Sequence, residues 1–472
     1  MSTPPRDAKA PKTVDLLVTN GVIVTVDAQR RILMNCAIAV DKGRIVDVGL
    51  VRSLESTYSA RQKIDARGAV VHPGYVDCHV HLAQQLGRGT IPDTWPEEKE
   101  LTQWLPYWTN MTEEDGYCSA MLSCLEMVRN GTTTFCENGG RFRSELTAEV
   151  ADRVGLRGGL SEICWDVPPH ESVSIGDTDA CLRSLERQLD ALPCVAGRRV
   201  WAIVGMAGMG RCTDRLLVEA KKLAESRGVL MDLHQSFGPE DVSDYLEHTK
   251  GVPAAAYLEQ LGVLGPATKL IHMIHAEEME VPVLARTDTS VTHCPAASLR
   301  VGMGVSRFGR FPEMVQQGVN VTLGSDSGNY SDAFDIGHQA YLATTIHREA
   351  RGVMPTITAE QAFEMATING ARAMGIADEL GSIEPGKKAD IVIQDRTRPE
   401  WHPGLDPMNS LLYSARSGPV HTVIVDGEII LRKGEFTRVD AEAELARIDR
   451  AGRSLYRRMG FNIQHRWPVV GE

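Results

Sequence analysis

Runs of β-branched residues lie near both ends of the chain, and turn dipeptides beside or within them predict short strands joined as hairpins. The runs cover residues 15–27, 36–49, 389–394 and 421–431. The turns are expected at Asn20-Gly21, Lys42-Gly43 and Asp426-Gly427. Because the two ends share this pattern, we expect them to form one β-rich unit.

Between the two ends, apolar strand-like runs alternate with helical stretches such as residues 112–129 and 214–226. This alternation predicts repeated strand–helix units around a parallel sheet. Eight strands are expected, at residues 70–81, 132–137, 157–165, 199–205, 230–235, 269–274, 290–294 and 320–326. Eight is the strand number of a (β/α)8 TIM barrel, so the predicted fold class is α/β.

Two more helices are expected after the barrel strands. Residues 358–374 lead back to the β-rich end, and residues 441–459 form an amphipathic helix with Leu445, Ile448 and Leu455 on its apolar face. The predicted units are residues 1–69 and 376–440 for the two parts of the β-rich unit, 70–375 for the barrel, and 441–472 for the terminal helix and tail.

Composition narrows the class of protein. A chain of 472 residues exceeds the ~250–300 at which single cores stop growing, and 43% hydrophobic with 24% charged residues is ordinary for a globular protein. A net charge of -12 disfavours nucleic-acid binding, and no apolar run approaches the ~18 residues of a membrane span. Residues 1–13 show no secretory signal, so we expect a cytoplasmic protein without a membrane partner and, from ten dispersed cysteines, without a disulfide framework.

The clearest chemical signal is the pair His79 and His81, two residues apart at the end of a predicted strand. A period of two places both imidazoles on one face, here the interior of the barrel at its C-terminal mouth. Neutral imidazoles are good ligands for a divalent metal such as zinc or iron. A hydrogen-bonded pair of structural histidines is the alternative for these two residues taken alone.

Three other predicted strands end in a polar residue of a related kind, His234, His272 and Asp326. Four histidines and one aspartate converging on one barrel mouth would be costly to bury without metal or water. We therefore predict metal-assisted hydrolysis, with Asp326 also accepting the proton of the attacking water. The expected ligands are His79, His81, His234 and Asp326.

Several sequence runs resemble the amidohydrolase superfamily over nearly the whole chain. They are HPGYVDCHVH at residues 72–81, GTTT at 131–134, LGSD at 323–326 and GSIEPGKKADIVIQD at 381–395. Residues 366–375 (ATINGARAMG) and 293–304 (HCPAASLRVGMG) resemble the branch of atrazine chlorohydrolase and the S-adenosylhomocysteine and guanine deaminases. The resemblance implies a TIM barrel with a composite β-sandwich from both termini.

The resemblance also implies roles for the matching positions. His79, His81, His234 and Asp326 match the family's metal ligands, with Asp326 as base, while His272 matches a histidine that contacts the reactive water or substrate in this branch and ligates metal in others. Some members of the family with two metal ions carry a bridging carboxylated lysine on the fourth strand. The predicted fourth strand of this chain has no lysine, which favours one divalent ion per subunit. Zinc or iron is expected, with cobalt and manganese as alternatives. Homo-oligomers, dimeric or larger, are frequent in this family.

The sequence departs from the family at the fifth strand. Deaminases of this branch place a glutamate three residues after the histidine, where it shuttles a proton, but Phe237 occupies that position here. Glu240, Asp241 and His275 are candidate replacements, although the two carboxylates would also suit an exposed helix start. A site without the shuttle favours attack on an exocyclic carbonyl.

A long segment after the first barrel strand is expected to cover the mouth. It holds Trp95, Trp104 and Trp108, which suit the wall of a pocket for a small, flat substrate, although they could equally anchor the loop. Further candidate substrate contacts are Gln84, Phe237, His275, Ser327 and Tyr330.

These observations leave three functional hypotheses. The first, which we favour, is hydrolysis of a C–N bond in a substituted urea, carbamate or amide, because the resemblance includes phenylurea hydrolases and molinate hydrolase, family members that attack an exocyclic carbonyl. The second is hydrolytic deamination or dechlorination of a heteroaromatic ring of the triazine, purine or pterin type. The third is a non-enzymatic scaffold, which the filled ligand positions disfavour.

Overall fold

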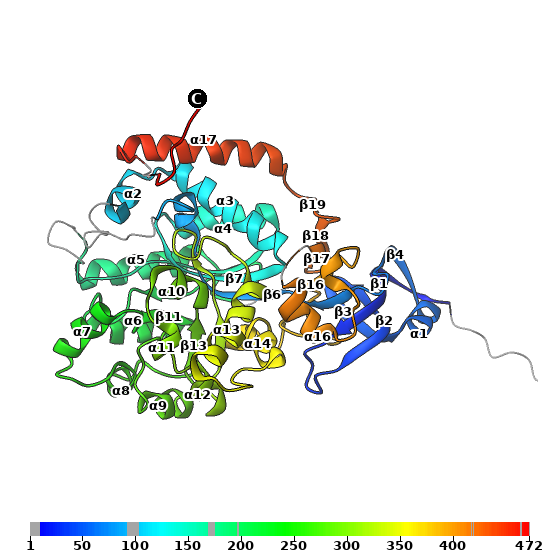
Figure 1. Ribbon diagram of the computed structural model, residues 1–472, viewed down its shortest axis with the longest axis horizontal. Coiled ribbons are helices and arrows are strands. Elements are labelled where there is room, and N and C mark those ends of the chain that lie inside the picture. The colour runs from blue at the N-terminus through cyan, green and yellow to red at the C-terminus, as the bar shows by residue number, and fades with distance from the viewer. Residues whose placement is uncertain are drawn as a thin grey trace, which may run out of the picture.

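The structure is a computed structural model that describes residues 10–91, 103–168, 175–195, 198–416, 418, 420–462 and 465–471. Figure 1 shows a barrel surrounded by helices, with a separate sheet beside it that combines the N-terminal strands and the strands that follow the barrel. Among the described helices, none has both the length and the apolar character needed to cross a bilayer.

The barrel consists of parallel strands that form two half-sheets. The first half-sheet contains β6 (Tyr75–His81), β7 (Thr132–Gly140), β8 (Arg157–Glu162), β9 (Val200–Ala202) and β15 (Asp326–Ser327). The second contains β10 (Val204–Met206), β11 (Met231–Gln235), β12 (Thr268–His272), β13 (Ser290–His293) and β14 (Val321–Leu323).

The half-sheets close on each other because two strands pass from one to the other. Only Ile203 separates β9 from β10, and only two residues separate β14 from β15, which pairs with β6. A parallel bridge between Cys164 and Met206 joins the two halves again after β8. When each interrupted strand is counted once, the described residues form the eight strands of a TIM barrel, as the sequence predicted.

Helices follow the barrel strands and cover the outside of the barrel. The first strand is followed by the 3-10 helix η1 (Leu82–Gly87) and by α2 (Leu105–Asn110) and α3 (Glu113–Arg129). The remaining barrel helices are α4 (Ser144–Val154), α5 (Thr178–Ala191), α6 (Asp214–Arg227), α7 (Pro239–His248), α8 (Ala254–Gln260), α9 (Glu280–Arg286), α10 (Pro295–Val301), α11 (Val305–Phe308), α12 (Phe311–Gln316) and α13 (Ile336–Arg351). The predicted helices at residues 112–129 and 214–226 are thus confirmed as α3 and α6.

Within the described part of the chain, the terminal sheet has nine strands drawn from both ends, which confirms the predicted composite unit. Its N-terminal strands are β1 (Lys12–Val24), β2 (Ile32–Asp41), β3 (Arg44–Leu50), β4 (Tyr58–Asp65) and β5 (Val70–Pro73), with α1 (Val51–Thr57) before β4. Its C-terminal strands are β16 (Ile391–Gln394), β17 (Val420–Val425), β18 (Glu428–Arg432) and β19 (Glu435–Phe436). Short helical segments lie between β16 and β17, at Pro399–Trp401, Pro407–Asn409 and Ser410–Ala415.

Two strand predictions were wrong in detail. Residues 70–81 are not one barrel strand, because β5 pairs with β1 and β16 in the terminal sheet and Gly74 separates it from β6. A Cβ at Gly74 would lie 2.0 Å from Thr133 Oγ1, so the chain changes sheets where only glycine fits. Asn20-Gly21 is not a hairpin turn but an irregularity within β1, where Asn20 has a φ of 57°.

Two helix predictions also need correction. Residues 358–374 form two helices, α14 (Ala359–Met365) and α15 (Ile368–Ala373), because Thr367 leaves helical geometry and its hydroxyl bonds the carbonyl of Phe363. The terminal helix α17 (Ala441–Met459) is confirmed, but Leu445 is 45% exposed and does not belong to its buried face.

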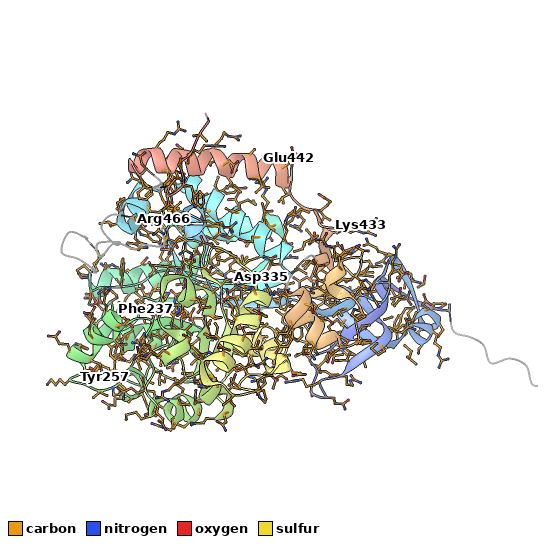
Figure 2. The ribbon with its side chains drawn as sticks, in the orientation of Figure 1. Phe237, Tyr257, Asp335, Lys433, Glu442 and Arg466 are labelled. Atoms are coloured by element: carbon orange, nitrogen blue, oxygen red, sulfur yellow. The ribbon has the colours of Figure 1, made fainter. Side chains whose placement is uncertain are left out.

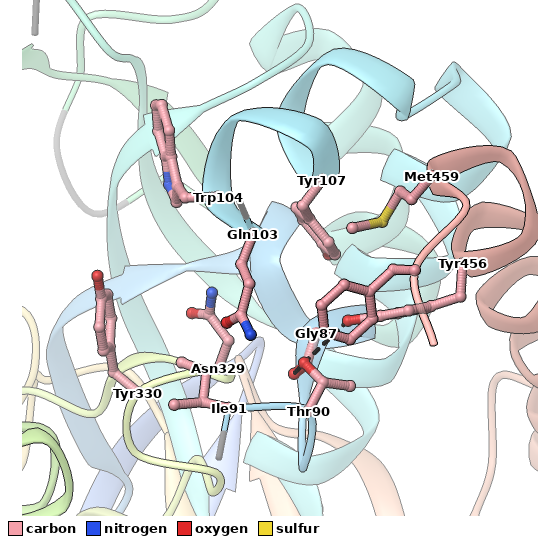
Figure 3. Close-up of a pocket in the computed structure, with 11 residues that line it drawn as sticks. Gly87, Thr90, Ile91, Gln103, Trp104, Tyr107, Asn329, Tyr330, Tyr456 and Met459 are labelled. Atoms are coloured by element: carbon pink, nitrogen blue, oxygen red, sulfur yellow. Dashed lines mark hydrogen bonds between the residues drawn. The ribbon is translucent and has the colours of Figure 1, made fainter. Parts of the chain in front are cut away.

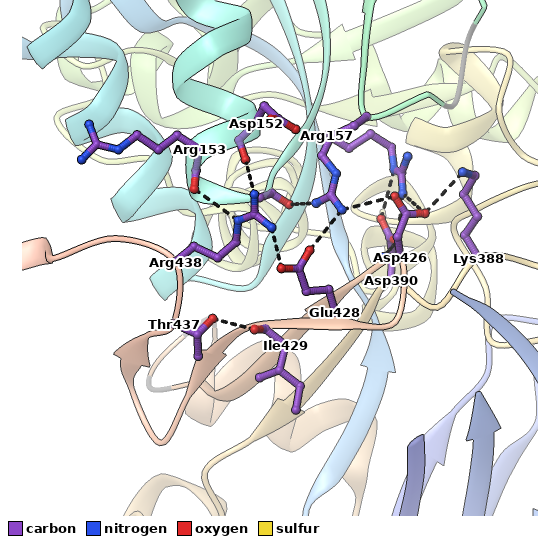
Figure 4. A network of polar contacts seen from close by, with 12 residues as sticks. Asp152, Arg153, Arg157, Lys388, Asp390, Asp426, Glu428, Ile429, Thr437 and Arg438 are labelled. Carbon is purple, nitrogen blue, oxygen red and sulfur yellow. Dashed lines mark hydrogen bonds and ion pairs between the residues drawn. The ribbon is translucent and has the colours of Figure 1, made fainter. Parts of the chain in front are cut away.

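A buried polar network fixes the terminal sheet against the barrel (Figure 4). The guanidinium of Arg157, at the start of β8, is fully buried and pairs with Asp390 at 3.2 Å and with Asp426 at 2.7 Å. Asp390 precedes β16 and Asp426 lies in the turn between β17 and β18. One barrel residue therefore holds two segments of the terminal sheet.

Candidate metal centre and substrate cavity

Five polar side chains converge at the C-terminal ends of the barrel strands, and we call them the ligand cluster. Their ring nitrogens and carboxylate oxygen form two groups within which all ligand atoms lie inside 4.8 Å of one another. Asp326 Oδ1 lies 3.5 Å from His79 Nε2 and 3.6 Å from His81 Nε2. The cluster consists of His79 and His81 from β6, His234 from β11, His272 from β12 and Asp326 from β15.

The spacing within the cluster fits a divalent metal ion. Two ligands of a tetrahedral zinc ion with bonds of about 2.1 Å lie about 3.4 Å apart. The ring nitrogens of His81 and His234 approach to 3.2 Å, and their rings stack almost in parallel, at an interplanar angle of 4°. The two distances from Asp326 to His79 and His81 are of the same size, so each of these three pairs is spaced like neighbouring ligands of one ion. The two groups that share His79 are His79 with His81 and His234, and His79 with His272 and Asp326.

Several ring nitrogens of the cluster have a lone pair that is free to bind a metal ion. Among the described residues, both ring nitrogens of His79 and Nδ1 of His81 are buried without a hydrogen-bond partner. His234 donates from Nδ1 to the carbonyl of Met206 at 3.3 Å, so its Nε2 carries the lone pair that faces His81. A bound cation would satisfy these nitrogens, and the residues present therefore fit a metal.

The environment keeps the imidazoles neutral, which is the form that binds metal. Burial lowers the pKa of His79 and of His81 well below the ordinary value, and the neighbouring histidines lower it further. Burial likewise lowers the pKa of His234, and it lowers that of His272 to about 3. All four rings therefore present lone pairs at neutral pH.

Two members of the cluster have an unusual backbone geometry. His272 has a φ of 77° and Asp326 a φ of 65°, in the left-handed region that non-glycine residues rarely adopt. Asp77 supports the same corner, because its Oδ1 accepts hydrogen bonds from the backbone N–H of Ser325 and of His79. The two ligand-bearing segments are thus tied to each other.

The strand-five position expected to carry a glutamate holds Phe237, whose ring lies 5.9 Å from the ring of His272 (Phe237 is labelled in Figure 2). Asp241 Oδ2 accepts a hydrogen bond from the backbone N–H of Phe237, and burial raises the pKa of Asp241 to about 7. Glu240 is exposed, as the alternative reading expected. His275 is bound through Nε2 to the carbonyl of Met303 and packs on Phe308.

A cavity of about 420 Å³ is lined by residues of α2, of α5 and of the end of β8, and no member of the ligand cluster is among its described lining residues. Trp104 and Trp108 stack at 5.4 Å in its wall, and Trp165, which the sequence did not single out, meets Trp104 edge-on at 6.2 Å. A Cβ at Gly139 would lie 2.7 Å from His81 Nδ1 and 3.8 Å from the side chain of Ile163, so Gly139 lies between the ligand cluster and one residue of the cavity wall.

The other predicted substrate contacts occupy different surroundings. Trp95 lies outside the described residues. Gln84 and Ser327 are buried, and the oxygen of each side chain lacks a hydrogen-bond partner among the described residues. Tyr330 lines a smaller pocket that also contains Trp104 and Tyr456 of α17, shown in Figure 3. The structure brings Trp104 to both pockets but does not place Gln84 or Ser327 in either.

Comparison with known proteins defines the class of protein. Residues 70–430 match the Amidohydrolase family. A 5'-deoxyadenosine deaminase from Methanothermobacter thermautotrophicus is 34% identical over 89% of this chain and 94% of its own. A zinc-bound adenosine deaminase from Xanthomonas campestris aligns with a TM-score of 0.88 and 24% identity, over 95% of this chain and all of that one.

A third protein, the zinc complex of atrazine chlorohydrolase from Arthrobacter aurescens TC1, aligns with a TM-score of 0.83 and 23% identity, covering 93% of this chain and all of that one. This chain belongs to the amidohydrolase family, as the family match and the relative at 34% identity show. It is an amidohydrolase-superfamily enzyme that acts on carbon–nitrogen bonds.

Proposed function

We propose that this enzyme hydrolytically removes an amino group from a flat nitrogen heterocycle, with an adenine nucleoside as the substrate class. The observation that carries the proposal is the ligand cluster, and the cavity lined by tryptophans supports the class of substrate. Large aromatic side chains suit the faces of a purine ring. The name of the relative at 34% identity favours this second hypothesis from the sequence over urea, carbamate or amide hydrolysis.

The residues of the cluster divide the work. We propose that His79, His81 and His234 hold one divalent ion together with Asp326; when bound, the ion supplies Lewis-acid activation of a water molecule. Zinc fits this donor set and is bound in two solved structures of the same fold. Asp326 accepts the proton of the attacking water, and His272 orients that water or the substrate.

Proton delivery to the ring must differ from the pattern with a strand-five glutamate. We assign it to Asp241, the carboxyl group held beside Phe237, because a pKa of about 7 leaves it partly protonated at neutral pH. The ring of Phe237 then packs against the substrate. The homo-oligomeric state and the cytoplasmic location stay predictions from the sequence.

Hydrolysis of an acyl C–N bond, as in a substituted urea, is a second candidate, and one specific observation favours it. Phe237 replaces a carboxylate at the position where ring protonation would need one, and attack on an exocyclic carbonyl has no such need. Both candidates use the same ligand cluster.

A competition experiment separates the two candidates. The zinc-loaded enzyme is incubated with 5'-deoxyadenosine, a substituted phenylurea and an aminochlorotriazine together, and the products are identified by mass spectrometry. We expect deamination of the nucleoside with the urea intact. Release of an aniline with the nucleoside intact would establish the second candidate instead.

Variants test the assigned roles. Asp326→Asn should lower kcat by at least about 10³-fold with an unchanged circular dichroism spectrum, because the barrel mouth carries the chemistry and the rest of the barrel carries the fold. Wild-type rates in Asp326→Asn would contradict the assignment of the base.

Phe237→Glu should raise the rate of deamination about tenfold or more by restoring the glutamate shuttle, and it should leave urea hydrolysis unimproved.

A further inference from the structure

A charged pair lies inside the barrel, below the ligand cluster. Lys269 in β12 is fully buried, and its ammonium group lies 2.8 Å from Asp232 Oδ1. Asp232, in β11, is also fully buried. The same ammonium donates to the carbonyl of Cys78 in β6 at 2.5 Å. Branched apolar side chains usually fill this part of a TIM barrel, so two charges here are unusual.

The two charged residues and the carbonyl that Lys269 contacts each lie within three residues of a member of the ligand cluster. Cys78 directly precedes His79, Asp232 is two residues before His234, and Lys269 is three residues before His272. β12 belongs to one half-sheet and β6 to the other, so the bond from Lys269 to Cys78 crosses the interior of the barrel. The pair therefore links the backbones that carry ligands on separate half-sheets.

A fourth barrel strand joins the same network. Asp232 Oδ2 accepts a hydrogen bond from the thiol of Cys136 at 3.6 Å, and the amide of Asn138 donates to the Asp232 carbonyl at 2.9 Å. Both Cys136 and Asn138 lie in β7, the neighbour of β6. The network thus fixes β11, which carries His234, against β7 as well.

The ring of His79 depends on this support. Among the described residues, neither of its ring nitrogens makes a hydrogen bond, and Asp326 Oδ1 approaches Nε2 only to 3.5 Å. Its position follows from its backbone, which is held by Lys269 at the preceding carbonyl and by Asp77 at its own N–H. Metal affinity depends on such outer contacts, because they orient the ligands before the ion binds.

We propose that Lys269, together with Asp232, is a positioning residue that sets the spacing between His79 and His234 for metal binding. Stability alone gives no reason for the pair, since well-packed apolar residues in place of a buried ion pair are often neutral or stabilising. This inference rests on the metal centre of the proposed function, but it concerns metal affinity and does not depend on the substrate.

The test uses the double variant Lys269→Met/Asp232→Val, which removes both charges and leaves neither partner buried alone. Binding of Co²⁺ to the full-length apoprotein is measured from its visible absorption bands, and Zn²⁺ affinity is measured by competition with a chelator. We expect at least about tenfold weaker binding of both ions and an altered Co²⁺ spectrum, with an unchanged circular dichroism spectrum.

A matched control separates positioning from a general effect of losing a buried lysine. Lys221 is also buried, and it bonds the hydroxyl of Thr268 at 2.9 Å, at the start of β12 and away from the ligand end. Lys221→Met should leave Co²⁺ affinity and spectrum unchanged.

Three results would overturn the inference. They are a double variant with wild-type affinity and spectrum, a double variant that does not fold even with Zn²⁺ present, and an equal loss of affinity in Lys221→Met. A wild-type protein that binds neither ion would overturn the metal centre and the proposed function together. Metal binding without any deamination would overturn only the function.

Discussion

His72 lies where the N-terminal strands of the terminal sheet pair with its C-terminal strands, and it is fully buried. In β5, its Nδ1 donates to the carbonyl of Pro73, and its Nε2 accepts from the side-chain amide of Gln394 in β16. Burial lowers the pKa of His72 to about 4. The ring is therefore neutral in the folded protein across the range in which an unfolded histidine takes up a proton.

The lowered pKa of His72 predicts acid sensitivity. Below pH 6.5 the unfolded chain gains a proton that the folded chain does not accept until about pH 4, so this histidine lowers the free energy of unfolding as pH falls through that window. In His72→Gln, the difference in stability between pH 7 and pH 4.5 should shrink by about 2 kcal/mol. Denaturant titrations at both pH values measure this change.

His465→Gln, in the exposed tail, is the control for the substitution itself. An undiminished pH dependence in His72→Gln would show that other buried groups account for the acid sensitivity.

At the scale of single residues, the sequence predicts side chains whose position follows from a strand and its end. His79 and His81 share a face because strands have a period of two, and His234, His272 and Asp326 lie at the same mouth because parallel strands end together. Lys269 and Trp165 were missed, since their partners come from strands or helices far away in the chain. A lysine within the predicted barrel strand, TKLIH in β12, was the one local signal for the buried pair.

At the scale of helices and strands, the sequence predicts where a helix begins if a capping residue marks that end. It does not predict which face of the helix is buried. Thr112 and Asp115 form a capping box that begins α3 where the sequence placed it, and Asp440 caps α17. The buried face of α17 depends on α2 and α3, against which it packs, and this face includes Ile448 and Leu455 but not Leu445.

This difference between two leucines of one helix gives a prediction. Leu455→Ala should lower the free energy of unfolding by about 2–5 kcal/mol, because Leu455 is fully buried and its loss leaves a cavity between α17 and the barrel helices. Leu445→Ala, the matched control, should change it by less than about 0.5 kcal/mol. Chemical denaturation measures both, and equal effects would contradict the observed orientation of α17.

Over the whole molecule, the barrel and the terminal sheet are linked by charges as well as by chain connections. Arg157 pairs with Asp390 and Asp426, and Asp390 also accepts the backbone N–H of Asp426. The strand pattern predicts that both ends of the chain form one β-rich unit, yet nothing local shows which barrel residue holds it. The reason is that the three charged residues come together only after both units have folded.

Removing Arg157 should weaken this link strongly. In Arg157→Met, the carboxylates of Asp390 and Asp426 lose their shared cation, and a buried pair broken on one side costs about 3–5 kcal/mol. Because the loss falls on the contact between the two units, the sheet should unfold before the barrel, and hydrogen exchange should show β16 and β17 opening first.

Arg44→Met is the control, because Arg44 pairs with Glu379 at the surface and such an exposed pair contributes at most about 1 kcal/mol. A single cooperative transition in Arg157→Met, with stability no lower than in Arg44→Met, would mean that the apolar contacts alone hold the sheet in place.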